Sequence, residues 1–168
     1  KAPRYRGKPF EVGPLARQIL CGSHPNRISA MDRTVARVAE SQKIAEILSA
    51  LLENVVLGVD TQERYQVPQQ AKGVGLIDTT RGALGHWMKI NQGVIGFYQI
   101  ITPSVWNFST RDEQTLGPSE LSLIGTPIAD SKNPVEIGRI LRSFDPCVSC
   151  ATHVLCPGNE AKTYKVVS

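Results

Sequence analysis

The sequence predicts a fold that is mainly α with a small β component. Residues 31–55 carry apolar side chains at helical spacing, and Ser29 with Asp32 three residues later forms a capping pair before them. After Gly58 the pattern changes to short apolar runs separated by glycines, which are typical of strands and turns. These two observations predict an α+β chain in which long helices of a bundle accompany short strands and loops.

The predicted long helix spans about 28 residues, or roughly 40 Å at the usual rise per residue. Gly58 supplies its stop signal. A helix of this length suits one member of a bundle and exceeds what a small isolated domain needs. Before it, residues 1–27 are rich in Pro, Gly and Arg, which predicts an irregular segment around a short helix near Leu15 to Leu20.

Short strands and short helices follow the long helix. The predicted strands are 74–78, 86–90 and 94–101. Residues 102–118, which include Pro103, are predicted to form an irregular loop. One helix is predicted to begin near Ser119, and another near Pro134, because proline favours the first position of a helix.

Composition and charge narrow the class of protein. The chain has 168 residues, of which 41% are apolar and 20% charged, as expected for one globular domain or a piece of a larger protein. No run approaches the roughly 20 apolar residues of a membrane span. The net charge of +4 is modest, and no nucleic-acid-binding motif accompanies the basic residues of the first segment. We therefore expect no nucleic-acid partner.

The cysteines point to metal or redox chemistry. They are Cys21, Cys147, Cys150 and Cys156. Three of the four lie within ten residues, so disulfides among them would constrain little of the unfolded chain. Metal ligation or redox chemistry is the better interpretation.

Cys147 and Cys150 form a CxxC pair, and His153 follows three residues later. Two thiolates at this spacing can bind one soft or borderline metal such as Zn, Ni or Fe. The sequence lacks a second CxxC or His pair for a zinc ribbon, and a thioredoxin-like pair would precede a helix rather than follow one. The pair therefore indicates half of a metal site, whose other ligands lie elsewhere. His153 fits either a ligand or a buried structural histidine.

Four blocks of sequence resemble one family. The stretch DPCVSCATHV (145–154) resembles the DPCxxCxxH motif that ends the large subunit of nickel–iron hydrogenases. Three further signatures of that family are similar, in the same order, to PRYRGKPFEVGPLAR (3–17), RGALGHWMKINQG (81–93) and YQIITPSVWNFSTRD (98–112). Because four ordered blocks cover most of the chain, the sequence is identified as a member of this family, and the resemblance implies the C-terminal part of the large-subunit fold.

The resemblance implies a nickel–iron centre and residues that act at it. Cys147 would be a terminal nickel ligand, and Cys150 would bridge nickel to an iron that carries CO and cyanide. Arg81 would lie over the vacant site, where its guanidinium polarises H2 or takes part in proton transfer. Asp145 would orient Arg81 through a charge-assisted contact.

A pocket for the diatomic ligands is also implied. Ser104, which follows Pro103, matches the position that donates a hydrogen bond to a cyanide. Thr80 stands where the family commonly has proline, which adds a hydroxyl and an N–H beside these ligands.

A second metal is implied nearby. His153 matches a ligand of a structural magnesium, or iron in some members. The Ile100 carbonyl would be another ligand, and Gln99 would act through water, which fits an octahedral, water-rich site. Glu11 and Arg17 are expected to form a structural ion pair, and Trp106 and Asn107 to be structural.

The resemblance also shows what is missing. The family signature RxCGxC, which carries the other two cysteines, does not occur, so the chain holds half of the thiolate ligands. We therefore expect a fragment of a longer large subunit or a subunit split in two, and Lys1 in place of Met favours the fragment. The expected partners are the remaining N-terminal part of the large subunit and a small subunit that carries iron–sulfur clusters.

The C-terminal stretch VLCPGNEAKTYKVVS (154–168) resembles a maturation peptide. In many members an endopeptidase cuts after the histidine of the last motif, so we expect cleavage after His153. Residues 1–153 would then be the functional part and 154–168 a removable extension. The alternative is a stable C-terminal strand that is never removed.

The function implied by the resemblance is the reversible oxidation of H2 to protons and electrons, most similar to the respiratory uptake type. The location would be periplasmic or membrane-associated through a signal on the small subunit, with a cytoplasmic location as the alternative. A rival from another class is a non-catalytic zinc-binding structural or assembly module that uses Cys147 and Cys150.

Overall fold

The computed structural model describes residues 1–60, 62, 65–147, 151–154 and 162–165. Its helices are α1 (Pro14–Leu20), α2 (Ala30–Leu52), α3 (Pro103–Asn107), α4 (Pro118–Leu123) and α5 (Val135–Ser143). Its strands are β1 (Gln70–Thr79), β2 (Gly82–Asn91), β3 (Val94–Ile101), β4 (Ala151–Val154) and β5 (Lys162–Lys165). The α+β class is confirmed, and β3 has the predicted bounds. β1 and β2 are longer than expected, and α2 is the one long helix among the described residues.

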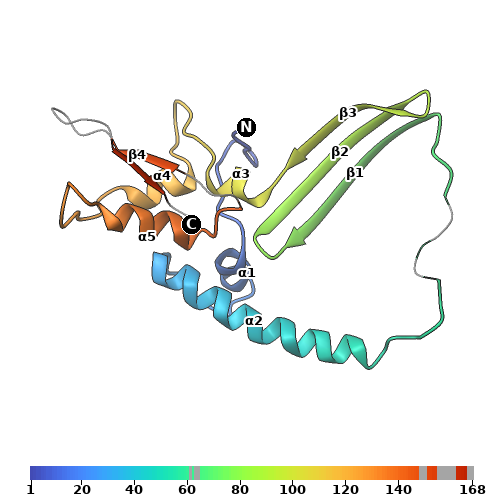
Figure 1. Cartoon of the computed structure of the whole chain (residues 1–168), viewed down its shortest axis with the longest axis horizontal. Coiled ribbons are helices and arrows are strands. Elements are labelled where there is room, and N and C mark those ends of the chain that lie inside the picture. Colours follow the sequence, from blue (N-terminus) through green and yellow to red (C-terminus); the bar gives the residue numbers. More distant parts are fainter. Residues whose placement is uncertain (61, 63–64, 148–150, 155–161, 166–168) are drawn as a thin grey trace.

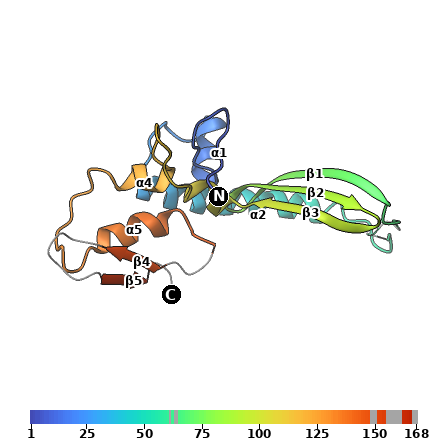
Figure 2. The ribbon, with the colours of Figure 1, turned by 90° about the horizontal axis from the view of Figure 1, so that it is seen from above.

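The elements meet at one end of an open structure. The sheet β1–β2–β3 and the helix α2 diverge from a common base like two arms, and the segment that connects α2 to β1 joins their far ends (Figure 1). Seen from above, α4, α5, β4 and β5 lie on the opposite side of that base (Figure 2). The base is therefore the place where segments far apart in sequence come together.

Helix α2 begins where the sequence predicts. The Ser29 hydroxyl accepts a hydrogen bond from the Asp32 amide at 3.1 Å, which satisfies one of the free N–H groups at the helix start. The helix ends at Leu52, six residues before Gly58, so it is shorter than expected. Its first half packs against α1 and α5, whereas Ile47, Leu48 and other apolar side chains of its second half are exposed.

The three long strands form an antiparallel sheet in the order β1–β2–β3. Thr79 pairs with Gly82, so Thr80 and Arg81 form a two-residue turn between β1 and β2. A register shift between Lys89 and Ile90 marks a bulge in the pairing of β2 with β3. The turn with Arg81 lies at the base of the molecule, and the bulge lies towards the far end of the sheet (Figure 1).

The predicted loop 102–118 contains a helix that the prediction missed. Pro103 starts α3, which is only five residues long and has too few periodic positions to show in the sequence. The two helices after it are confirmed: α4 begins at Pro118, and the Glu120 carboxylate accepts a hydrogen bond from the Gly117 amide at 2.9 Å. α5 ends at Ser143, and Phe144 separates it from the DPC motif.

The N-terminal segment crosses the base and is held along its length. Asn107, which is buried, accepts a hydrogen bond from the Val12 amide and donates one to the Val12 carbonyl, at 2.8 and 3.0 Å. Arg4 pairs with Asp112 at 2.8 Å, and this contact, with the amides of Gln114 and Thr115, holds the pKa of the Asp112 carboxyl well below its usual range. These contacts confirm the structural role expected for Asn107.

Gly13 and Gly82 allow two backbones to touch at the Arg81 turn. Gly82 has φ +124°, and a Cβ there would stand 2.7 Å from the Gly13 nitrogen. Gly13 has φ +123°, and a Cβ there would stand 2.8 Å from the Arg81 carbonyl oxygen. Since real Cβ atoms do not approach so closely, only glycine fits on either side of this contact.

We expect Gly82→Ala to lower the free energy of unfolding by at least about 3 kcal/mol, since it adds a backbone collision to a left-handed strain. Chemical unfolding of the purified variant measures this. The matched control is Gly125→Ala, which shares the positive φ but has no atom within 4 Å of the added Cβ. It should lose only about 1 kcal/mol. Equal losses in the two variants would contradict the close backbone contact.

Candidate metal centre

Arg81 is carried by the turn between β1 and β2, and this turn is tied down on both sides. Within the turn, the Thr79 hydroxyl donates to the Gly82 carbonyl at 2.8 Å. From α1, the Arg17 guanidinium donates to the carbonyls of Thr79 and Thr80 at 3.0 and 3.2 Å. The backbone that leads to Arg81 is therefore fixed by hydrogen bonds to another element.

Asp145 reaches Arg81 from the end of α5. Its backbone is in the left-handed conformation, with φ 52°, which turns the chain sharply after the helix. The Arg81 Nε donates to the Asp145 main-chain carbonyl at 3.0 Å and lies 3.1 Å from its Oδ2, while Nη2 lies 3.4 Å from Oδ1. The predicted Arg81–Asp145 contact is thus present in the structure.

This ion pair does not hold itself in place. The side chains of Arg81 and Asp145 are 39% and 40% exposed. An ion pair this open contributes roughly 0–1 kcal/mol, because water screens the charges and two side chains lose freedom. The geometry of the pair must therefore come from the backbones that present it.

Cys147 lies two residues beyond Asp145 and is joined to α3. Its thiol is free and exposed, and its amide donates to the Ser104 hydroxyl oxygen at 3.2 Å. Ser104 occupies the first turn of α3, next to the buried Pro103. The fold therefore brings Arg81, Asp145, Cys147 and Ser104 together from three separate parts of the chain.

Of the other predicted site residues, those that the structure describes form no hydrogen bond with the Arg81–Asp145 pair, and the rest lie outside the described residues. The Ile100 carbonyl, on β3, accepts a hydrogen bond from Lys1 Nζ at 2.8 Å, and Gln99 pairs with Trp87 across the sheet. Thr80 is exposed. Cys150 lies outside the described residues, and His153 is described only by its backbone, which pairs with Thr163 of β5.

The expected ion pair between Glu11 and Arg17 is wrong. Arg17 instead forms a bidentate pair with Glu40 of α2, at 2.7 and 2.6 Å, and also contacts Asp78. Hydrogen bonding to Glu40 is the main cause that raises the pKa of Arg17. Glu11 pairs with Arg33 of α2, at 2.8 Å for both oxygens. Both residues lie on the segment 3–17, but each finds its partner on a helix that the sequence could not place beside it.

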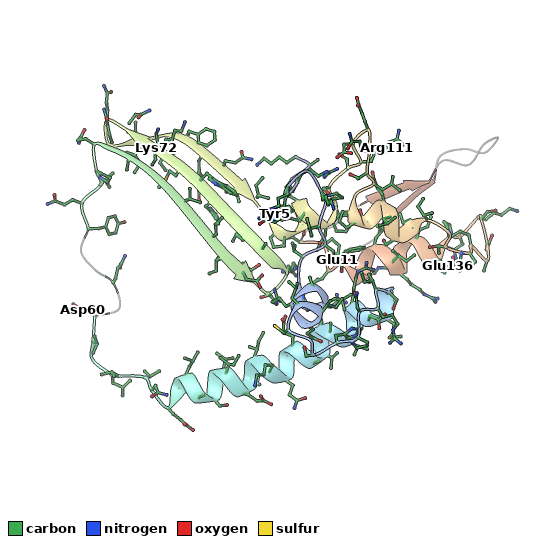
Figure 3. The ribbon with its side chains drawn as sticks, turned by 180° about the vertical axis from the view of Figure 1, so that it is seen from behind. Tyr5, Glu11, Asp60, Lys72, Arg111 and Glu136 are labelled. Atoms are coloured by element: carbon green, nitrogen blue, oxygen red, sulfur yellow. The ribbon has the colours of Figure 1, made fainter. Side chains whose placement is uncertain are left out.

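Sequence reasoning missed the polar residues of α2 that face the base. Arg33, Arg37 and Glu40 follow one another at helical spacing and all contact other segments. Figure 3 shows Glu11 near the centre of the molecule, where Arg33 pairs with it. Their spacing could have revealed them: they lie four and three residues apart within the predicted helix, which places all three side chains on one face.

The residues present fit part of a soft metal site. Cys147 offers a free thiol that is open to solvent, as a ligand must be before a metal binds, and thiolates suit nickel and iron. Over the described residues, which leave out Cys150 and the side chain of His153, no group of three or more His, Cys, Asp or Glu converges. The described part thus supplies one cysteine thiol and its surroundings, not a complete ligand set.

These features define a chain that places one cysteine and an Arg–Asp pair at the meeting point of several segments. The sequence profile described as nickel-dependent hydrogenase matches residues 22–153. The chain therefore belongs to the nickel-dependent hydrogenase family.

Curated relatives agree with this assignment. The chain is 37% identical to the uptake hydrogenase large subunit of Cupriavidus necator, covering 99% of this chain and 35% of the relative. It is also 37% identical to the quinone-reactive Ni/Fe-hydrogenase large chain of Wolinella succinogenes, covering 99% and 34%. It is 38% identical to the periplasmic [NiFeSe] hydrogenase large subunit of Desulfomicrobium baculatum, covering 92% and 35%. The chain thus spans about a third of the length of these relatives.

A solved structure has the same fold. The Ni-Fe-Se hydrogenase of Desulfovibrio vulgaris Hildenborough in the reduced state superposes with a TM-score of 0.78 and 35% identity, over 87% of this chain and 36% of that one. Among the described residues, no helix has the length and apolar character needed to cross a membrane.

Proposed function

We propose that this chain forms the C-terminal part of the catalytic large subunit of a nickel–iron hydrogenase, which oxidises H2 reversibly to protons and electrons. The observation that carries the proposal is the Arg81–Asp145 pair, held two residues from the free thiol of Cys147. The relative named above as an uptake hydrogenase favours the uptake direction.

Cys147 and Cys150 would hold the nickel–iron centre from this chain, Cys147 as a terminal nickel ligand and Cys150 as a bridge to iron. The other two thiolates would come from the remaining N-terminal part of the large subunit. When bound, the centre would supply a soft, redox-active metal pair, with CO and cyanide on the iron, at which the H–H bond is polarised and electrons are accepted.

Arg81 and Asp145 would act on the substrate side of the centre. The guanidinium stays charged at any physiological pH and has five N–H donors. Asp145 engages Nε and Nη2, and the positive charge, which is delocalised over the whole guanidinium, would face the site. We expect this charge to assist cleavage of H2 and to orient the proton that is released, which the Cys147 thiolate could accept.

Ser104, Pro103 and Thr80 would form the pocket for the diatomic ligands. The Ser104 oxygen accepts a hydrogen bond from the Cys147 amide, so its own O–H remains free to donate to a cyanide nitrogen. The buried Pro103 adds an apolar wall beside it. Thr80 presents a hydroxyl that the usual proline lacks.

A magnesium, or iron, site would use His153 and the Ile100 carbonyl, with Gln99 acting through water. Oxygen ligands and retained waters are what magnesium prefers. In this proposal the metal would replace the Lys1 ammonium that hydrogen-bonds to the Ile100 carbonyl.

Large exposed apolar surfaces support further partners. The chain exposes 12661 Å², well above the roughly 8,000 Å² typical of a compact protein of this mass. Large apolar side chains are exposed on the second half of α2 and on the sheet. We infer that the remaining part of the large subunit covers these surfaces. An iron–sulfur small subunit would carry the electrons and determine a periplasmic, membrane-associated or cytoplasmic location.

We further propose that residues 1–153 are the functional part and that 154–168 are removed by a maturation endopeptidase that cuts after His153. In the unprocessed chain, β5 pairs in antiparallel fashion with β4, which contains His153. Removal of 154–168 would take away this partner strand and let the CxxC motif settle around the metals.

Cysteine variants should separate the metal ligands from a bystander. We expect Cys147→Ser, in the complete purified enzyme, to reduce bound nickel at least about tenfold, since hydroxyl is a poor ligand for a soft metal. Elemental analysis of nickel, iron and zinc measures this. Cys21→Ser is the matched control, because Cys21 is also free and exposed, and it should keep full nickel. Zinc without nickel in the wild-type enzyme would contradict the proposed function.

The role of Arg81 can be tested without disturbing the ligands. We expect Arg81→Lys to leave metal content intact and to reduce H2 turnover about 100-fold or more, because lysine cannot make the forked contact with Asp145. Arg139→Lys, on the exposed side of α5, is the matched control and should retain wild-type turnover. Full activity in Arg81→Lys would remove Arg81 from the mechanism.

Processing is tested by intact mass. We expect the polypeptide purified with its metals to end at His153, and the polypeptide from nickel-starved cells to retain residues 154–168. Mass spectrometry distinguishes the two. A metal-loaded enzyme that retains Ser168 would contradict removal of the extension and favour a permanent C-terminal strand.

A further inference from the structure

One face of α2 contacts the end of α5 directly and reaches the turn that carries Arg81 through Arg17 of α1. Arg33, Ala36, Arg37 and Glu40 lie on this face, and Ala36 is fully buried against its neighbours. A narrow crevice at the base is lined by these segments, namely by Glu11, Arg33, Arg37, Thr80, Arg81 and Asp145. The ion pair and the helix thus share one small region of the molecule.

At the Asp145 end, Arg37 holds the turn that follows α5. Its Nη1 donates to the Ser143 carbonyl at 2.5 Å. The last carbonyls of a helix lack partners within the helix, and a cation there is also favoured by the helix dipole. Because Asp145 follows Ser143 by two residues and is itself in the left-handed conformation, the position of this carbonyl determines where the carboxylate points.

Arg33, four residues before Arg37 on α2, supports the same segment after α5. Its guanidinium lies 3.8 Å from the centroid of the Phe144 ring and 3.4 Å from the Ser143 hydroxyl oxygen. It also carries the bidentate contact with Glu11. Residues of α2 therefore hold this segment through the Ser143 carbonyl and through the side chains of Ser143 and Phe144.

At the Arg81 end, Glu40 acts through Arg17. Glu40 holds Arg17 by two hydrogen bonds, and Arg17 in turn donates to the carbonyls of Thr79 and Thr80 directly before Arg81. Arg37 and Glu40 are three residues apart, or roughly 4.5 Å along the helix axis. A rigid helix thus connects the two turns over a short distance.

We propose that α2 sets the separation of the Arg81 guanidinium from the Asp145 carboxylate, with Arg37 as the positioning residue for Asp145 and Glu40, through Arg17, as that for Arg81. The inference rests on the proposed function for its consequence in catalysis. The positioning of the two side chains by α2 does not depend on that function, because an ion pair this exposed cannot fix its own geometry.

The first test removes the contact of Arg37 with Ser143. In crystals of the complete enzyme carrying Arg37→Gln, we expect the distance from Arg81 Nη2 to Asp145 Oδ1, now 3.4 Å, to lengthen beyond hydrogen-bonding range. Lys43→Gln is the matched control, since Lys43 lies on the same helix but pairs outward with Glu46 at 70% exposure. It should leave the distance unchanged. An unchanged distance in Arg37→Gln would overturn the inference, whatever the enzyme catalyses.

Turnover then tests the consequence. Displacement of a polarising group by about 1 Å can cost up to about 100-fold, so we expect Arg37→Gln to lower H2 oxidation about 10- to 100-fold with nickel content unchanged. Infrared bands of the iron-bound CO and cyanide should shift in Arg37→Gln and not in Lys43→Gln, since the charge near these ligands has moved. Arg37→Lys keeps a cation at the Ser143 carbonyl and should recover most of the activity. This milder variant also serves if Arg37→Gln does not fold, and it should then show a smaller change of the same distance.

A double-variant cycle distinguishes positioning from general support. If Arg37 acts through Asp145, Arg37→Gln should change turnover less than about twofold when Asp145→Asn is already present. Losses that multiply in the double variant would mean that Arg37 acts elsewhere and would overturn the inference. If the Arg81–Asp145 distance lengthens in Arg37→Gln but the protein holds no nickel and oxidises no H2, only the proposed function is overturned.

Discussion

The buried guanidinium of Arg33 imposes a constraint on the whole base of the molecule. A charge that is only 5% exposed must be paired and hydrogen-bonded, or its burial costs several kcal/mol. Arg33 meets this requirement with the Glu11 carboxylate, the Ser143 hydroxyl and the face of the Phe144 ring. These groups come from the N-terminal segment and from the end of α5. Pairing one charge therefore brings together three segments that lie up to 110 residues apart.

The candidate site sits on the outer side of this junction and depends on it. Arg81 and Asp145 are both more than a third exposed. Such a pair adds little to stability, so the free energy that holds it comes from buried neighbours. The Gly13–Gly82 contact, the double hydrogen bond of Asn107 and the arginines of α2 provide this support. Precision at the site is thus a property of the scaffold.

The same arrangement leaves much apolar surface uncovered. Helix α2 has two different halves: the first is anchored by Arg33, Arg37 and Glu40, and the second projects with exposed leucines and isoleucines. The sheet also projects away from the base beyond its turn at Arg81, and side chains stand on both of its faces (Figure 3). A chain that spans about a third of its relatives and is anchored at one end is suited to packing against further protein along both arms.

Local patterns determined much of this protein in advance. The capping of α2 by Ser29, the start of α4, the α+β class and the family all follow from neighbouring residues and from motifs, because caps, turns and ligand spacings are short-range features. The contact between Arg81 and Asp145 was also anticipated, but through family resemblance rather than from any property of the two residues.

Only the tertiary structure decided which charges meet. Arg17 and Glu11 lie six residues apart and suggested a local pair, yet each binds α2, at Glu40 and Arg33. Nothing in the spacing along the chain reveals that one face of a helix will pack between α1 and α5. The partners of long side chains depend on that packing, because an ion pair forms wherever burial leaves a charge in need of one. The sequence thus predicted most of the elements and the family, and the packing of α2 decided which charges meet.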